Sequence, residues 1–244
     1  MAGFPGDFGA YLWRLAPGLT VFLALLAVLP RRALFPRLVV YILSFVLFRD
    51  TMTPFRYWSF SPEGAIRFAE SPGLLFLLAG MSVGFIGMIQ GLEPEMRELV
   101  KWRLGSALEV FWGLAGALVI AAPVWAFQHV MGFTSPAVSA RVLPALLTLC
   151  LLGNLLEEYL FRGILQGWLE TLTTPTRAAL GSGLFFAAFH ASLAIAVTAV
   201  GLPIVFFVVW EGLLCAFLRR RGGVLPAALA HGGALFLLTA GILG

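Results

Sequence analysis

Two adjacent glutamates and an arginine interrupt one of the apolar runs of this sequence, at Glu157, Glu158 and Arg162. A charged side chain at the centre of a membrane-spanning helix costs about 2.5 to 3.5 kcal/mol, so this cluster needs a partner or a function. On a helix, Glu158 and Arg162 stand four residues apart on one face, which predicts an ion pair. Glu157 lies about 100° around the helix and stays available for chemistry. An ion pair that only locks helix packing is the structural alternative, but it leaves the second glutamate unexplained.

Two of the three histidines are expected at a similar depth. His190 and His231 each lie near the middle of a later apolar run. A single intramembrane histidine commonly serves an interhelical hydrogen bond, but beside two carboxylates the pair is better interpreted as part of one site. His129 lies at the end of its run, where an interfacial position explains it.

Three further residues are candidates to bind substrate in the same cavity, namely Asn154, Phe186 and Glu211. Asn154 precedes Glu157 by one turn and is placed to orient its carboxylate. Phe186 stands four residues before His190. Glu211, in the middle of its apolar run, either lines the cavity or pairs with a polar neighbour such as Asn154 or the Arg219 cluster.

Glutamate and histidine in a membrane-embedded cavity offer a base that deprotonates water, a proton shuttle and an imidazole that stabilises an oxyanion, which suits amide hydrolysis. Water is the expected nucleophile, because the sequence has no Gly-x-Ser-x-Gly and neither Cys150 nor Cys215 has a neighbouring base. The two cysteines are assigned no role. Two histidines and a glutamate are also a zinc ligand set, although His-Glu-x-x-His is absent and three helices would have to supply the ligands. We expect no metal and no other cofactor.

The elements that must position these residues are membrane helices. The chain is 60% hydrophobic and 11% charged, with a mean hydropathy of +0.96, which excludes a soluble globular domain. We predict an all-α polytopic membrane protein, a bundle of about eight transmembrane helices around a membrane-embedded catalytic cavity. The apolar runs cover about 13–30, 33–48, 73–92, 105–128, 138–168, 176–196, 199–218 and 224–243.

These helices are expected to form a single domain over residues 1–244, with helices one to four in 1–137 and the catalytic core in 138–244. The loop 49–72 has the aromatic and proline content of an interfacial segment. A second interfacial segment, 93–103, is expected to run directly into the fourth helix. Glycines four residues apart in the third helix, at Gly80, Gly84, Gly87 and Gly91, predict close helix packing.

The basic residues fall mainly in alternate loops. Most of the 16 Lys and Arg belong to the loops after the first, third, fifth and seventh runs, and by the positive-inside rule both termini then lie outside. The arginine-rich composition suggests a bacterium, and therefore the inner membrane. The expected partners are membrane lipids and a hydrophobic or membrane-anchored client protein. We expect no nucleic acid, because no basic patch alternates with exposed aromatics.

Three motifs resemble those of one family. Glu157-Glu158-x-x-x-Arg162, Phe186-x-x-x-His190 and His231, within about residues 138–243, resemble the CPBP family. This is the CAAX-protease and bacteriocin-processing (Abi) family of intramembrane glutamic endopeptidases, which includes the Ras-converting endopeptidase and myxosortase-like members. The resemblance implies an eight-helix bundle with a cavity open to the cytoplasmic side.

The resemblance also implies roles for the motif residues. Glu157 and His190 would activate a water, with support from Glu158 and Arg162. His231 would form an oxyanion hole with a residue four positions on, usually Asn or Asp. That position is Leu235 here, which offers no donor.

The sequence therefore predicts an intramembrane endopeptidase of glutamic type that cleaves near the hydrophobic C-terminal segment of a client. Two other classes stay open. A glutamate–histidine proton relay in a transporter would use the same residues, although broken helices and inverted repeats are not evident. A non-catalytic Abi-like scaffold or immunity protein is compatible with Leu235.

Overall fold

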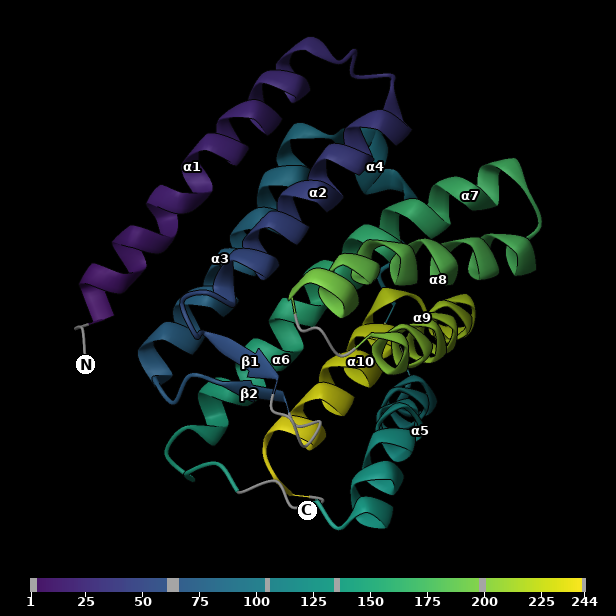
Figure 1. Ribbon diagram of the computed structural model, residues 1–244. Helices are drawn as coiled ribbons and strands as arrows, with labels where there is room; N and C mark the ends of the chain where they lie inside the picture. Colours follow the sequence, from purple (N-terminus) through teal and green to yellow (C-terminus); the bar gives the residue numbers. More distant parts are fainter. Residues whose placement is uncertain (1–3, 61–65, 104–105, 134–136, 198–200, 243–244) are drawn as a thin grey trace.

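The computed structural model describes residues 4–60, 66–103, 106–133, 137–197 and 201–242, which form a helical bundle with one small hairpin (Figure 1). The α-helices are α1 (Phe4–Val28), α2 (Leu34–Met52), α3 (Pro72–Leu92), α4 (Pro94–Leu99), α5 (Ala107–Met131), α6 (Leu143–Glu158), α7 (Gln166–Leu172), α8 (Pro175–Ser192), α9 (Leu202–Gly222) and α10 (Val224–Thr239). Two π-helical segments, η1 (Tyr159–Leu165) and η2 (Leu193–Val197), continue α6 and α8. Strands β1 (Trp58–Phe60) and β2 (Ile66–Phe68) form the hairpin.

The long helices have the length and composition of membrane spans. Within the described residues, six stretches are apolar enough to cross a bilayer, at 8–28, 72–92, 107–131, 143–172, 175–195 and 202–222. Two further helices lie at the remaining predicted runs: α2, which carries Arg37, Arg49 and Asp50, and α10, which is only 16 residues long. The predicted all-α polytopic membrane protein is confirmed.

The segment between α3 and α5 differs from its prediction. Residues 93–103 do not run directly into the next long helix, because α4 ends at Leu99 and Val100 is extended. The helix α5 starts at Ala107, after the N-cap Ser106. The Ser106 hydroxyl accepts a hydrogen bond from the Glu109 N–H, while the Glu109 carboxylate accepts one from the Ser106 N–H. This capping box satisfies the first free N–H groups of α5 and fixes its start. The prediction missed it because the hydrophobic pattern alone does not locate a cap.

The hairpin lies inside the loop that the sequence analysis assigned to the interface. Trp58 pairs with Phe68 and Phe60 with Ile66 in antiparallel register. The indole of Trp58 donates a hydrogen bond to the Arg49 carbonyl, which ties the hairpin to the end of α2. Strands of three residues are too short to show an alternating pattern, which is why the sequence analysis did not predict them.

The glycines of α3 do not mark a helix contact, so that prediction is wrong. A Cβ atom added at Gly80, Gly84, Gly87 or Gly91 would meet nothing within 4 Å. The close approaches occur elsewhere. At the crossing of α8 and α9, a Cβ on Gly212 would lie 2.9 Å from the Gly183 carbonyl oxygen, and between α10 and α6 a Cβ on Gly232 would lie 2.5 Å from the Cys150 carbonyl oxygen. Small residues permit a close approach, but the neighbouring helix decides whether one occurs.

The bundle has two distinct ends. At the hairpin end, which holds the start of α1, the end of α2 and the end of α10, the Tyr11 hydroxyl donates to the Phe48 carbonyl and the Val138 N–H to the Ala240 carbonyl. At the arginine-rich end, which holds the α3–α4, α7–α8 and α9–α10 connections, Glu170 pairs with both Lys101 and Arg219. The basic residues of this end are Arg31, Arg32, Arg37, Arg97, Lys101, Arg103, Arg177, Arg219, Arg220 and Arg221.

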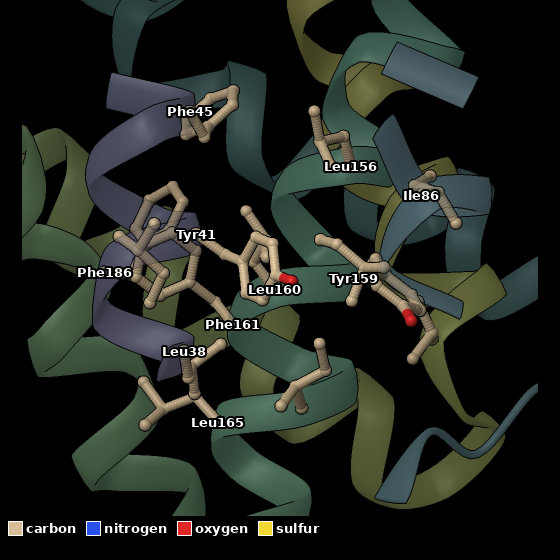
Figure 2. Close-up of a cluster of buried hydrophobic side chains, with 14 of the residues drawn as sticks. Leu38, Tyr41, Phe45, Ile86, Leu156, Tyr159, Leu160, Phe161, Leu165 and Phe186 are labelled. Carbon is tan, nitrogen blue, oxygen red and sulfur yellow. The ribbon is translucent and has the colours of Figure 1, made fainter. Parts of the chain in front are cut away.

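A cluster of buried apolar side chains surrounds η1. Tyr159, Leu160 and Phe161 are fully buried and pack with Leu38 and Phe186, among others, as Figure 2 shows. All seven residues of η1 are buried. This packing holds the charged turn at the junction of α6 and η1 in one position.

Candidate active site

The charged turn lies where α6 becomes π-helical. Glu157 and Glu158 are the last residues of α6, and Arg162 lies in η1. The predicted ion pair is confirmed, with Arg162 Nη1 at 3.0 Å from Glu158 Oε1 and both side chains fully buried. A π-helical turn widens the helix locally and is frequent at functional sites. The carboxylate of Glu157 does not take part in the ion pair of Glu158 and Arg162.

Arg162 is held by more than its carboxylate. Its Nη2 donates a 2.8 Å hydrogen bond to the Gly212 carbonyl of α9, and its guanidinium lies 4.3 Å from the ring centroid of Phe186. Phe186 also packs against His190, with ring centroids 4.2 Å apart and the rings tilted by 34°. Phe186 is therefore enclosed between the arginine and the histidine, and it is not among the residues that line the cavity.

Glu157 meets His190 across the gap between α6 and α8. Glu157 Oε2 is 3.3 Å from His190 Nε2, and both residues are buried. His190 Nδ1 lies 2.8 Å from the Phe186 carbonyl. A carbonyl only accepts, so Nδ1 carries the hydrogen and Nε2 of the neutral ring presents its lone pair. A carboxylate oxygen and an imidazole lone pair at this separation can both accept hydrogen bonds from one water.

His231 connects two other carboxylates. Its Nδ1 lies 2.9 Å from Glu158 Oε1, the oxygen that also faces Arg162, and its Nε2 lies 3.5 Å from Glu211 Oε1. Of the two alternatives for Glu211, the structure brings this residue to the cavity, whereas Arg219 pairs with Glu170 at the arginine-rich end.

Asn154 lines the cavity but does not orient Glu157. Its Nδ2 donates a 2.6 Å hydrogen bond to the Cys150 carbonyl on its own helix. His129 lies outside the site, stacked on Trp125 near the end of α5. Cys150 and Cys215 are both buried.

An apolar cavity of about 230 Å³ lies against these groups, in the half of the bundle nearer the hairpin. Its wall includes Glu157, His190, Glu211, His231 and Leu235. Aromatic and aliphatic side chains supply most of the remainder, among them Phe45, Phe48, Met52, Trp58, Phe60, Phe68, Met81, Phe85 and Phe207. Such a wall favours a hydrophobic ligand.

Sequence reasoning missed Arg49 as a residue of this cavity. Its guanidinium pairs with Asp50 at 2.9 Å and donates to the Phe189 carbonyl at 3.4 Å, next to His190. The available signal was an arginine at the very end of an apolar run, followed at once by an aspartate. That pattern is also typical of a helix end at the membrane interface, and the sequence analysis therefore assigns residue 49 to the interfacial loop 49–72.

One set of potential metal ligands occurs in the described residues. One ligand atom each of Glu158, Cys215 and His231 lies within 4.8 Å of the others. This set differs from the zinc hypothesis of two histidines and a glutamate. Glu158 Oε1 already faces Arg162 and His231, and the Cys215 thiol donates to the Ala227 carbonyl.

The fold and the site define a polytopic membrane protein with buried glutamate–histidine pairs beside an apolar cavity. Residues 139–237 match the family model described as type II CAAX prenyl endopeptidase Rce1-like. This match supports the assignment of this part of the chain to the CAAX protease family, which the resemblance predicted, and that family supports intramembrane endopeptidase activity in general. No curated protein and no solved structure matches the chain. The matched segment contains Glu157, His190, Glu211 and His231, whereas Arg49 and the hairpin precede it.

Proposed function

We propose that this protein is a glutamic intramembrane endopeptidase in which Glu157 and His190 activate a water for peptide hydrolysis. The observation that carries the proposal is the 3.3 Å approach of Glu157 Oε2 to His190 Nε2 in the wall of an apolar cavity. A water beside both atoms donates one hydrogen bond to the carboxylate and one to the imidazole lone pair. Its oxygen bonds to the substrate carbonyl carbon, Glu157 takes its proton, and that proton passes to the leaving amine as the C–N bond breaks.

The second pair of groups supports this step. Glu158, fixed by Arg162, accepts from His231 Nδ1–H at 2.9 Å. The nitrogen of His231 that remains for the substrate is Nε2, which donates to a developing oxyanion when the ring carries both hydrogens. No step of this mechanism needs a metal.

The client is a protein with a hydrophobic segment. The cavity wall is mostly aromatic and aliphatic, and Trp58, Phe60 and Phe68 of the hairpin contribute to it. These features favour an extended apolar stretch near the C-terminus of a membrane-anchored protein.

The distribution of charge favours a site that faces away from the cytoplasm. The cavity belongs to the hairpin end of the bundle, and most basic residues lie at the opposite, arginine-rich end. By the positive-inside rule the arginine-rich end is cytoplasmic, so both termini and the cavity face outward across a bacterial inner membrane. This orientation disagrees with the cytoplasmic opening implied by the family resemblance, and it makes an exported protein the client.

Cysteine labelling tests the orientation. The two native cysteines are buried, whereas Glu70 and Arg31 are exposed at the hairpin end and the arginine-rich end. In intact cells a membrane-impermeant maleimide is expected to label a Glu70→Cys variant, and to label Arg31→Cys only after lysis. The reverse pattern would restore the cytoplasmic opening.

Cleavage of a peptide tests the catalytic proposal. Purified protein in detergent is mixed with peptides that span the C-terminal hydrophobic segments of exported proteins. Wild type is expected to cut, Glu157→Gln and His190→Ala to lose activity, and Glu98→Gln, at an exposed glutamate of α4, to keep it. Cleavage by Glu157→Gln would refute the glutamic mechanism, and inhibition by a chelator with recovery on added zinc would favour the metal alternative. A proton flux without any cleavage would favour the relay.

A further inference from the structure

The oxyanion hole of the proposed mechanism lacks one donor. His231 supplies a single N–H towards the cavity, because its Nδ1 is engaged with Glu158. Leu235, one turn further along α10, lines the same cavity and has no hydrogen to donate. The loss of one oxyanion donor costs about 10²- to 10³-fold in rate, so a hydrolase with this site needs a replacement.

Glu211 has the required position. It lies on α9, is 5% exposed, and lines the cavity together with Glu157 and Leu235. Its Oε1 is 3.5 Å from His231 Nε2. Two atoms at this separation both reach a third atom at hydrogen-bonding distances of about 2.9 Å, so one substrate oxygen can accept from both.

The uncharged polar side chains of the cavity wall are engaged. Asn154 donates to the Cys150 carbonyl and Ser82 to the Leu78 carbonyl. Arg49 uses Nε for Asp50 and Nη2 for the Phe189 carbonyl, and its buried Nη1 has no hydrogen-bond partner among the described residues. Within the described chain, Glu211 has no hydrogen bond, and its nearest charged partner is His231.

We propose that Glu211, in its protonated form, is the second oxyanion donor of this enzyme and replaces the side chain missing at Leu235. This inference rests on the proposed endopeptidase function. In the tetrahedral intermediate the oxyanion accepts hydrogen bonds from His231 Nε2–H and from the Glu211 carboxyl hydrogen. The proton stays on Glu211 throughout, so its role is electrostatic.

The protonation state matters because the surroundings are charged. Glu157, Glu158, Arg162 and His231 all act on Glu211, and His190 and Arg49 line the same cavity. An ionised Glu211 would accept but not donate, and its negative charge would repel the oxyanion. Activity therefore requires Glu157 to be ionised while Glu211 is protonated, which predicts a fall in kcat as pH rises through the titration of Glu211.

Chemical complementation tests the assignment. The kcat and KM for peptide cleavage are measured for wild type, Glu211→Gln, Glu211→Leu and the double variant Glu211→Leu/Leu235→Asn. Glu211→Leu is expected to lower kcat about 10²-fold with little change in KM. Glu211→Gln, whose amide donates at all pH values, is expected to stay within about tenfold of wild type and to lack the alkaline fall in kcat. The double variant is expected to regain at least tenfold over Glu211→Leu.

Each result separates the inference from the function on which it rests. An active wild type whose kcat is unaffected by Glu211→Leu would overturn the role of Glu211 alone. So would Glu211→Gln as inactive as Glu211→Leu, or a double variant without any gain. Thermal unfolding of each variant distinguishes lost catalysis from lost folding. A wild type that cuts no peptide would overturn the proposed function and this inference with it.

Discussion

Replacement of Gly232 by alanine tests how the site is held together. Gly232 follows His231 on α10, and an added Cβ would lie 2.5 Å from the Cys150 carbonyl oxygen and 2.9 Å from the Leu151 Cα. Both are backbone atoms of α6, which cannot rotate away. Ordinary contact begins at 3.4 Å, so α10 must move by about 0.9 Å (3.4 − 2.5). Overpacking of this kind costs about 1 to 3 kcal/mol.

The displacement acts directly on the site. His231 is the neighbouring residue, and its 2.9 Å contact with Glu158 crosses the same α6–α10 interface. A misplacement of about 1 Å near reacting groups lowers activity about 10²-fold. We therefore expect Gly232→Ala to unfold about 2 to 12 °C below wild type, and its kcat to fall about 10²-fold.

The assay pairs thermal unfolding in detergent with peptide cleavage. Gly84→Ala is the matched control, because a Cβ there meets nothing within 4 Å and alanine is the better helix former. This control is expected to be at least as stable as wild type and fully active. Equal stability of Gly232→Ala and Gly84→Ala would refute the close approach of α6 and α10, whether or not the protein is a protease.

Two further predictions concern the buried ion pairs. Replacing Arg162 by Met leaves the fully buried Glu158 with only the imidazole of His231 and is expected to lower the free energy of unfolding by about 3 to 5 kcal/mol. Adding Glu158→Gln to that variant should recover part of the loss, and an equal loss in both would contradict a buried-charge origin. Arg37→Met breaks the buried pair with Glu93 and is expected to cost a similar amount, while kcat per folded molecule stays unchanged because the pair lies at the arginine-rich end. The control for stability is Lys101→Ala, which breaks an exposed ion pair and should lower the free energy of unfolding by at most about 1 kcal/mol. A fall in kcat with Arg37→Met would contradict the separation of the two ends.

The three buried carboxylates of the site differ in how firmly neighbouring groups hold them. Arg162 and His231 both face Glu158, whereas Glu157 makes its ion-pair contact with the imidazole of His190 in the cavity wall. Glu211 lies beyond His231. Three buried carboxylates thus have different neighbours, and the proposed mechanism gives each a different task. A single charge-neutralising variant at each position would measure how far those tasks are separate.

The sequence predicted the local part of this arrangement well. The ion pair of Glu158 and Arg162 follows from a spacing of four residues on one helix. The prediction that Glu157 points elsewhere follows from the same geometry, and the structure places it against His190. Asn154 was placed on the correct face, but its amide donates to the carbonyl of the preceding turn, because a short polar side chain on a helix can reach the carbonyl four residues back.

Partners on different helices were less predictable. The sequence allowed two alternatives for Glu211, a place in the cavity wall or a pair with another polar residue. It placed Arg49 in an interfacial loop. Both meet the site only because α2, α8, α9 and α10 converge at the hairpin end. Nothing in the local sequence encodes which turn of one helix faces which turn of another, since that depends on side-chain packing along the whole interface.

The sequence by itself determined that this chain is a bundle of membrane helices and that a charged turn lies within it, because hydrophobicity and helical periodicity are properties of contiguous residues. It also identified a family through three short motifs. Only the tertiary structure decided where the helices touch: the glycines of α3 face open space, while Gly183, Gly212 and Gly232 mark the close contacts. The tertiary structure likewise brought Glu211 within 3.5 Å of His231, beside a leucine that cannot donate. The physical reason is that contacts between helices are made by the shapes of two surfaces, and one stretch of sequence describes only one of them.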